Sequence, residues 1–233
     1  MTALTKPDAL ALLKKYKVNE RVLEHATAVH DYAMEIAGNV PCDRGLVEAG
    51  SLLHDIGRAR SHGIDHAVIG ADILRGEGVD ERIVNIVERH VGSGLTPGEA
   101  KVLGLPPKDY VPKTIEERIV CHADNLIGST ERVSIRETVA RARKKWFPEA
   151  VDRLINMHYE VFRPDIVGVK ENAPAVKNGD LKGIEKYLDA LLMDCDLLFK
   201  VKRENGKYAV ALYGQDSKKA AKYLLDKGIA ERI

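Results

Sequence analysis

Four histidines and two aspartates between residues 25 and 124 have residue types and positions that suit a metal site. Each lies among apolar residues near the end of a segment with helical periodicity: His25, His54, Asp55, His66, His90 and Asp124. A neutral imidazole nitrogen and an anionic carboxylate oxygen both ligate divalent ions, and burying them is costly unless something satisfies them. Taken singly, each residue is explained as readily by packing, but the six together favour a metal site.

The sequence contains two His-Asp dipeptides, and helix geometry separates them. His54-Asp55 follows the small and apolar residues "AGSLL". His25 shares the apolar stripe of the preceding predicted helix, whereas His30 lies five residues further on, about 140° round a helix of 3.6 residues per turn. We therefore expect His30-Asp31 to face solvent and His54-Asp55 to face the protein interior.

The elements that must position these residues are predicted to be helices. Apolar periodicity predicts helices over 20–37, 44–57, 65–78, 81–92, 115–128 and 134–161, after a first helix that starts at Thr5, Pro7 and Asp8. Asp43 and Asp80 are expected to cap helices at their N-termini, Thr114 to start another, and Gly57 to close the helix that holds His54. The Gly- and Pro-rich stretch 92–113 is expected to be a connection with one short helix.

The composition changes after this region. Residues 163–180, "RPDIVGVKENAPAVKNGD", are predicted to be a linker. A helix over 181–194, a β-hairpin over 196–214 with Asn205-Gly206 at its turn, and a helix over 216–233 follow. The expected fold is a mainly α helical bundle over 1–165 followed by a small α+β (α-β-β-α) module over 172–233.

Composition narrows the class of protein. The 233 residues are 45% hydrophobic and carry a formal net charge of +1, which gives no general attraction to nucleic acid or anionic lipid. No apolar run is long enough to span a bilayer, and the first residues do not have the pattern of a secretory signal. Cys42, Cys121 and Cys195 form no CxxC pair, so a reducing cytoplasm is expected rather than a disulfide framework or a thiolate zinc site.

The order and spacing of the six residues, together with the strings "LLHDIG", "H-x4-GA", "ERHVGSG" and "HADNLI", resemble the HD superfamily of metal-dependent phosphohydrolases. These strings are similar to those of HDIG-type proteins of archaea and of bacterial HD hydrolases that split diadenosine tetraphosphate. The resemblance covers roughly residues 15–135 and does not extend to the tail from about residue 172.

The resemblance implies a role for each residue. A first metal ion would be held by His25, His54, Asp55 and Asp124, and Asp55 would bridge to a second ion held by His66 and His90. His62 lies four residues before His66, so it either exchanges roles with it or faces substrate or solvent. Arg58 stands where HDIG proteins commonly have Lys, and it either grips phosphate or faces solvent. The implied catalytic residues are Asp55, Arg58 and His62, whereas His122 and His158 are expected to be structural.

The implied activity is hydrolysis of a nucleotide-like phosphate substrate by water activated between two divalent ions, which could be Fe, Mn, Co, Ni or Zn. The sequence has no G-x-S-x-G motif and no P-loop. One alternative is an HD-type di-iron oxygenase, which uses the same ligand pattern.

Another alternative is a nucleotide- or RNA-binding regulator. It would use the basic residues of the tail, which are Lys200, Lys202, Arg203, Lys207, Lys218, Lys219 and Lys222. Because nearby acidic residues nearly neutralise them, a solvated face or a homo-oligomer contact is favoured over nucleic acid.

Overall fold

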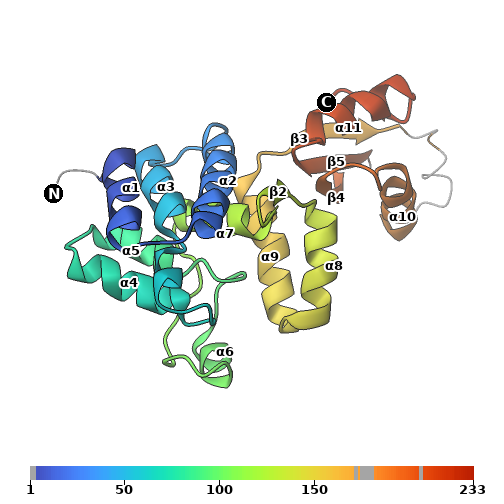
Figure 1. Cartoon of the computed structure of the whole chain (residues 1–233). Helices are drawn as coiled ribbons and strands as arrows, with labels where there is room; N and C mark the ends of the chain where they lie inside the picture. Colours follow the sequence, from blue (N-terminus) through green and yellow to red (C-terminus); the bar gives the residue numbers. More distant parts are fainter. Residues whose placement is uncertain (1–3, 171–172, 174–180, 205–206) are drawn as a thin grey trace. The chain divides into compact units, whose positions relative to one another are not determined.

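The computed structural model describes residues 4–170, 173, 181–204 and 207–233. These residues form two compact units (Figure 1). The first comprises the chain up to residue 133 and residues 137–161, and the second comprises residues 134–136 and 162–233. The division at 161/162 falls a few residues before the expected end of the helical bundle at 165.

The first unit is helical, with one small hairpin. Its helices are α1 (Lys6–Lys15), α2 (Glu20–Ala37), α3 (Arg44–Leu53), α4 (His66–Gly76), α5 (Glu81–Glu88), α6 (Pro97–Val102), α7 (Ile115–Asn125), α8 (Ile135–Lys145) and α9 (Pro148–Val161), and the first two residues of α8 belong to the second unit. A 3-10 turn, Ile56–Ala59, lies in the connection between α3 and α4. The hairpin pairs β1 (Ile127–Gly128) with β2 (Glu131–Arg132). α2 packs on α3 and α7, while α5 packs on α3, α4 and α7.

Side-chain caps fix where these helices begin. Thr5 accepts from the backbone of Asp8 at the start of α1, and Asp43, Asp80 and Thr114 cap α3, α5 and α7 in the same way. An N-cap oxygen satisfies a backbone N–H that has no partner within the helix. The four predicted helix starts are therefore confirmed, and they set which residues α3, α5 and α7 turn toward the core.

Two expectations about helix ends are wrong. α3 ends at Leu53, and Gly57 lies in the 3-10 turn, so it does not close the helix. The predicted helix 134–161 is two helices, because the chain turns between Lys145 and Pro148 and Pro148 begins α9. A proline fits the first turn of a helix but not its interior, since it has no N–H to donate.

His30 also differs from its prediction. Its side chain is buried, with Nε2 3.1 Å from Lys6 Nζ and Nδ1 3.3 Å from Ser51 Oγ, while Asp31 is exposed. α2 packs on both α3 and α7, and His30 contacts Ser51 of α3, so the buried surface of α2 is wider than a single apolar stripe. The dipeptide is therefore split between the interior and the solvent.

The second unit has the order β3 (Asp165–Val169), α10 (Leu181–Leu191), β4 (Leu197–Glu204), β5 (Lys207–Gly214), α11 (Ser217–Asp226) and β6 (Ala230–Glu231). Its four strands form an antiparallel sheet in the order β4-β5-β3-β6. This is the double split β-α-β arrangement. Apolar residues of α10 and α11 pack with alternate strand residues in one core, including Ile184, Leu188, Leu224, Val210 and Leu212.

The expected mainly α fold with a small α+β module is confirmed, but the module is larger than the predicted α-β-β-α unit. The first strand, β3, lies inside the stretch predicted to be a linker, and β6 lies inside the last predicted helix. The predicted turn residues Asn205-Gly206 fall outside the described residues. Across the described parts of the chain, no helix is both long enough and apolar enough to cross a membrane.

Candidate metal centre

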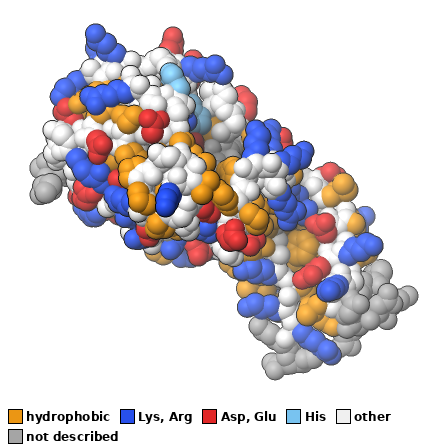
Figure 2. Space-filling view, turned by 90° about the horizontal axis from the view of Figure 1, so that it is seen from below, with side chains coloured by type: hydrophobic (Ala, Val, Ile, Leu, Met, Phe, Trp, Pro, Cys, Tyr) orange, Lys and Arg blue, Asp and Glu red, His pale blue; other side chains and the backbone are white. Residues whose placement is uncertain are grey.

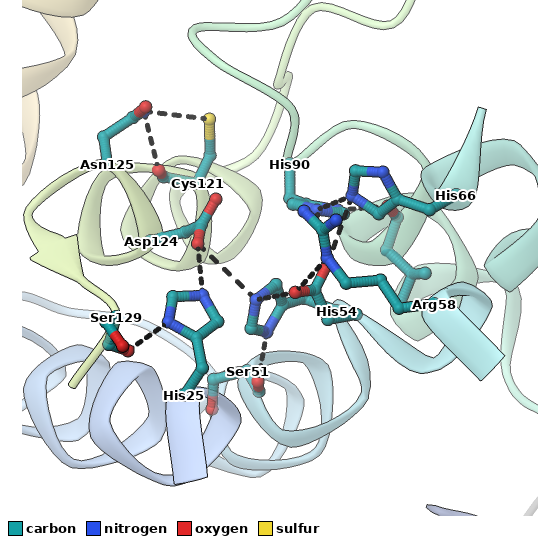
Figure 3. A network of polar contacts seen from close by, with 12 residues as sticks. His25, Ser51, His54, Arg58, His66, His90, Cys121, Asp124, Asn125 and Ser129 are labelled. Carbon is teal, nitrogen blue, oxygen red and sulfur yellow. Dashed lines mark hydrogen bonds and ion pairs between the residues drawn. The ribbon is translucent and has the colours of Figure 1, made fainter. Parts of the chain in front are cut away.

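The six predicted ligands lie together at the centre of the first unit (Figure 3). Their nitrogen and oxygen atoms form three overlapping groups, and within each group the ligand atoms are within 4.8 Å of one another. The groups are His25–His54–Asp55, His54–His90–Asp124 and Asp55–His66–His90. Neither His62 nor Arg58 belongs to any of the three groups.

Helix ends deliver most of these side chains. His54 is the C-cap of α3 and Asp55 follows it, while His90 lies two residues beyond the end of α5. His66 is the first residue of α4, and Asp124 lies in the last turn of α7. Because a helix end has backbone groups without partners, it can hold a side chain through one of them.

Three histidine rings are held by the same local hydrogen bond. Nδ1 of His54, His66 and His90 lies 2.7 Å from the carbonyl oxygen three residues earlier in each case, and those carbonyls belong to Ser51, Gly63 and Val87. A carbonyl only accepts, so Nδ1 carries the proton and donates it. Each ring in its neutral form therefore presents the lone pair of Nε2 to the centre, which is the usual arrangement of a metal-binding histidine.

Nδ1 of His25 is also held by a backbone carbonyl, but this carbonyl lies far from His25 in the sequence. Its Nδ1 lies 2.6 Å from the carbonyl oxygen of Ser129, in the turn between β1 and β2, and its Nε2 lies 3.0 Å from Asp124 Oδ1. Ser129 has a φ of 65°, a left-handed conformation that is uncommon for a residue with a side chain. Sequence periodicity did not identify this hairpin, because its two strands are only two residues each.

The two carboxylates bind the cluster together. Asp55 Oδ1 lies 3.1 Å from His66 Nε2 and 3.6 Å from His90 Nε2, and Asp55 Oδ2 lies 3.7 Å from His54 Nε2. Asp124 Oδ1 lies 3.5 Å from His54 Nε2. Asp55 thus contacts histidines on both sides of the cluster, the position expected for a bridging ligand.

Electrostatics at the centre favour positive charge. Burial opposes protonation of His54, but Asp55 and Asp124 raise its pKa to about 9. Burial also opposes ionisation of Asp55, yet His54 and His66 hold the pKa of this carboxyl well below its usual range. In the same way, the pKa of Asp124 is lowered by hydrogen bonds from His25 and His54, against the effect of burial. Two carboxylates thus stay ionised in an interior site, a condition that a bound cation would stabilise.

The residues fit a metal ion by their own geometry. His54 Nε2 and Asp55 Oδ1 are buried, and neither has a hydrogen bond of acceptable geometry among the described residues. His66 Nε2 and His90 Nε2 lie 3.0 Å apart although the Nδ1 of each ring is already a donor. Unsatisfied buried polar atoms are uncommon in native proteins, so His54 Nε2 and Asp55 Oδ1 suit an additional partner such as an ion.

Gly57 explains how α4 comes close enough to contribute His66. A Cβ atom at position 57 would lie 1.9 Å from the carbonyl oxygen of His66 and 2.7 Å from the backbone nitrogen of Gly70. The backbones of the 3-10 turn and α4 therefore touch at this point. Only glycine allows this approach, so the glycine of the "HDIG" string positions a ligand.

Arg58 contacts the cluster, whereas His62 has no contact with it among the hydrogen bonds and ion pairs of the described residues. Arg58 Nε donates to Asp55 Oδ2 at 2.5 Å, and 30% of its side chain is exposed. His62 is exposed in the loop before α4, outside the three ligand groups. His122 and His158 are both buried and lie 3.0 Å apart through Nε2 and Nδ1, away from the ligand set.

The loop after His90 is tied to α7 by Cys121 and Asn125, to which the sequence assigned no role at the site. The carbonyl oxygen of Gly92 accepts from Asn125 Nδ2 and lies 3.1 Å from Cys121 Sγ. Burial raises the pKa of the Cys121 thiol well above its ordinary value. These contacts hold the chain between His90 and α7, and no sequence spacing predicts them because they join residues about 30 positions apart.

Comparison with known proteins agrees with this geometry. The family model described as the HD domain matches residues 22–128. An uncharacterised protein of Methanocaldococcus jannaschii is 51% identical over 142 residues, which are 59% of this chain and 83% of that protein. The chain belongs to the HD-domain family. The resemblance read from the "LLHDIG" and "HADNLI" strings is therefore confirmed.

Other relatives are longer proteins that match this chain over part of their length. A tRNA (cytidine(56)-2'-O)-methyltransferase of Thermoplasma volcanium is 49% identical over 149 residues, which are 64% of this chain and 44% of that protein. A ribonuclease Y of Acidothermus cellulolyticus is 30% identical over 147 residues, 59% of this chain and 27% of that protein. The chain thus spans less than half the length of these relatives.

Among solved structures, the HD domain of the Listeria monocytogenes phosphodiesterase PgpH in complex with cyclic-di-AMP aligns with a TM-score of 0.44 at 19% identity. The alignment covers 64% of this chain and 83% of that one.

Proposed function

We propose that this HD-domain protein is a metal-dependent phosphohydrolase that uses two divalent ions on a nucleotide-like phosphate substrate. The observation that carries the proposal is the position of Asp55, whose two oxygens contact histidines of two ligand groups. A carboxylate shared in this way is suited to hold two cations close together. Membership of the HD-domain family supports hydrolysis as the reaction class.

The ligands divide into two sets that share Asp55. As the family resemblance implies, we assign His25, His54 and Asp124 to the first set, and His66 and His90 to the second, where they form a close group with Asp55. Ligands of this kind accept Fe, Mn, Co, Ni or Zn, so the donor set does not select one metal. When bound, the ions would supply an activated water and neutralise charge on the phosphoryl oxygens.

The remaining residues act on ligands and substrate. Arg58 holds Oδ2 of Asp55 and so fixes the orientation of the shared carboxylate. Its partly exposed guanidinium places positive charge beside the cluster, where it suits a phosphoryl oxygen. His62 is exposed in the loop before α4, and we assign it a contact with substrate rather than with metal.

The test is to purify the protein, measure its bound metals and screen phosphate substrates. The screen should include bis-nucleoside polyphosphates, cyclic nucleotides, mononucleotides and short RNA. RNA is included because the names of the tRNA methyltransferase and ribonuclease Y relatives refer to it. Phosphate-ester hydrolysis that disappears in Asp55→Ala is expected. A protein that binds no metal, or an Asp55→Ala variant with unchanged activity, would overturn the proposal.

The methyltransferase name does not compete directly with this proposal. More than half of the Thermoplasma volcanium protein lies outside its match to this chain. Oxygen uptake should be recorded in the same assays, because substrate-dependent O₂ consumption without phosphate-ester cleavage would identify an oxygenase instead.

A further inference from the structure

We propose that the C-terminal end of α8, formed by Arg143, Lys144, Lys145 and Trp146, binds the backbone of single-stranded RNA. The inference rests on the proposed function and deepens it, because it makes the substrate of the metal centre a polynucleotide rather than a single nucleotide. We call these four residues the α8 patch.

The α8 patch carries concentrated positive charge. Arg143, Lys144 and Lys145 are consecutive and exposed, and none forms an ion pair within the described part of the chain. Arg141, one turn earlier, is also exposed but pairs with Glu137 in the same helix. Seen from below, where the turn between α8 and α9 faces the viewer, Lys and Arg side chains gather on the surface (Figure 2).

Two arginines outside the α8 patch, by contrast, form ion pairs with glutamates. Arg89 lies 2.9 Å from Glu117, and Arg153 lies 2.7 Å from Glu99. These pairs are largely buried and hold helices together. Unpaired exposed cations, in contrast, are available to phosphate oxygens of a ligand, and this contact releases counterions from a nucleic acid.

Trp146 links the α8 patch to the metal centre. A Cβ atom on Gly92 would lie 3.7 Å from two ring carbons of Trp146, so the indole lies against the backbone of that glycine. Gly92 is two residues beyond the ligand His90, and its carbonyl is held by Cys121 and Asn125 of α7. The end of α8 therefore lies against the loop that leaves the metal centre.

The chemistry of the α8 patch favours a nucleic acid strand over other anions. Trp146 is only partly buried, and an aromatic face beside several cations is the arrangement that stacks bases while it binds a backbone. A single phosphate group at the metal centre would be served by Arg58 alone. Further cations beyond the Gly92 loop suit a substrate that continues past the reacting phosphate.

One structural explanation must be separated from this role. Cations in the last turn of a helix interact favourably with its dipole, so the α8 patch could stabilise α8 alone. That role would affect the free energy of unfolding and would not distinguish RNA from small substrates. The experiment therefore compares two substrates in the same variant.

The test variant is Arg143→Glu/Lys144→Glu/Lys145→Glu in the full chain. The matched control is Lys218→Glu/Lys219→Glu/Lys222→Glu on α11, which changes the net charge equally at three exposed lysines of the second unit. The assays are hydrolysis of a fluorescent 12-nucleotide RNA and of bis(p-nitrophenyl) phosphate, with bound metal measured in each protein. A glutamine version of the α8 triple variant covers the case in which charge reversal prevents folding.

We expect the ratio of kcat/KM for RNA to kcat/KM for bis(p-nitrophenyl) phosphate to fall about tenfold or more in the α8 variant and to stay unchanged in the control. Three lost phosphate contacts on a single strand should also lower the slope of log binding constant against log salt by about 2. An unchanged ratio, or an equal fall in both variants, would overturn the inference.

RNA binding separates failure of this inference from failure of the proposed function. Fluorescence anisotropy with the Asp55→Ala protein measures binding without hydrolysis. If the protein bound RNA through the α8 patch but had no hydrolase activity, the RNA-binding site would be supported and the proposed hydrolase function would be wrong. If the protein hydrolysed small phosphodiesters but bound no RNA at low salt, the hydrolase function would be supported and the RNA-binding site would be wrong.

Discussion

His66 and His90 point Nε2 at Nε2 across 3.0 Å, while Nδ1 of each ring donates to the carbonyl three residues earlier. Two neutral rings held in this way place two lone pairs against each other. The repulsion between these lone pairs is relieved by a proton or a cation that lies between the rings and Asp55. A metal ion bound at this point would therefore satisfy buried groups of the folded protein.

Removal of metal should therefore lower stability. A ligand that binds only the folded state stabilises it by about 2.7 kcal/mol when its concentration is 100 times Kd. We expect dialysis against a chelator to lower Tm by several degrees and re-addition of metal to restore it. Differential scanning calorimetry with and without the ion measures this. An identical Tm in both states would contradict a metal within the centre.

The two ligand sets should lose their ions separately. His25→Ala removes a ligand of the first proposed site only, and His66→Ala a ligand of the second only. Each variant should therefore keep close to half of the metal bound by the unaltered protein, whereas Asp55→Ala should lose nearly all of it. Metal content by mass spectrometry, with His62→Ala as the control that keeps its full content, decides the assignment. Full metal content in His66→Ala would show that His66 is not a ligand and that other residues hold the second ion.

Gly57→Ala should damage both stability and the metal centre. The new methyl group would lie 1.9 Å from the His66 carbonyl oxygen, so the 3-10 turn and α4 must separate. Overpacking of this kind costs about 1–3 kcal/mol or more. Urea unfolding and metal content measure the two effects.

Gly76→Ala is the matched control for Gly57→Ala, because Gly76 is also in this region, at the end of α4, and nothing lies within 4 Å of its added methyl group. Since alanine favours a helix over glycine, Gly76→Ala should be neutral or slightly stabilising. Equal effects in the two variants would show that close backbone contact is not the cause.

Glu99 should make stability depend on pH. It completes the capping box of α6 and lies 2.7 Å from Arg153. Burial opposes its ionisation, but hydrogen bonds from Thr96 and the guanidinium of Arg153 lower its pKa below the ordinary 4.5. A lowered carboxyl pKa contributes stability that is present above the ordinary value and is lost as the pH falls through the lowered one.

We therefore expect Glu99→Gln to lower the free energy of unfolding by about 1–3 kcal/mol at pH 7. The difference from the unaltered protein should narrow as the pH falls below 4.5. Urea unfolding at several pH values measures it, and the exposed Glu149→Gln provides the control. A difference that stayed constant with pH would mean that the ionised carboxylate is not the stabilising form.

The sequence by itself predicted the six residues that cluster in the first unit and most of the helices that carry them. Caps such as Asp43, Asp80 and Thr114 act on the next few residues, and helical periodicity is a property of one segment. His54, His66 and His90 could therefore be recognised at helix ends, since local signals decide where a helix begins and which face is apolar.

Only the tertiary structure decided what those faces meet. His30 is buried because α3 covers its side of α2, and Gly57 matters because the backbone of α4 passes within contact distance. β3 is a strand because it pairs with β5 on one side and with β6 on the other, and β6 is a strand because it pairs with β3, which lies far away in the sequence. Strand pairing and close backbone approach are contacts between distant residues, and nothing in a local pattern specifies the partner.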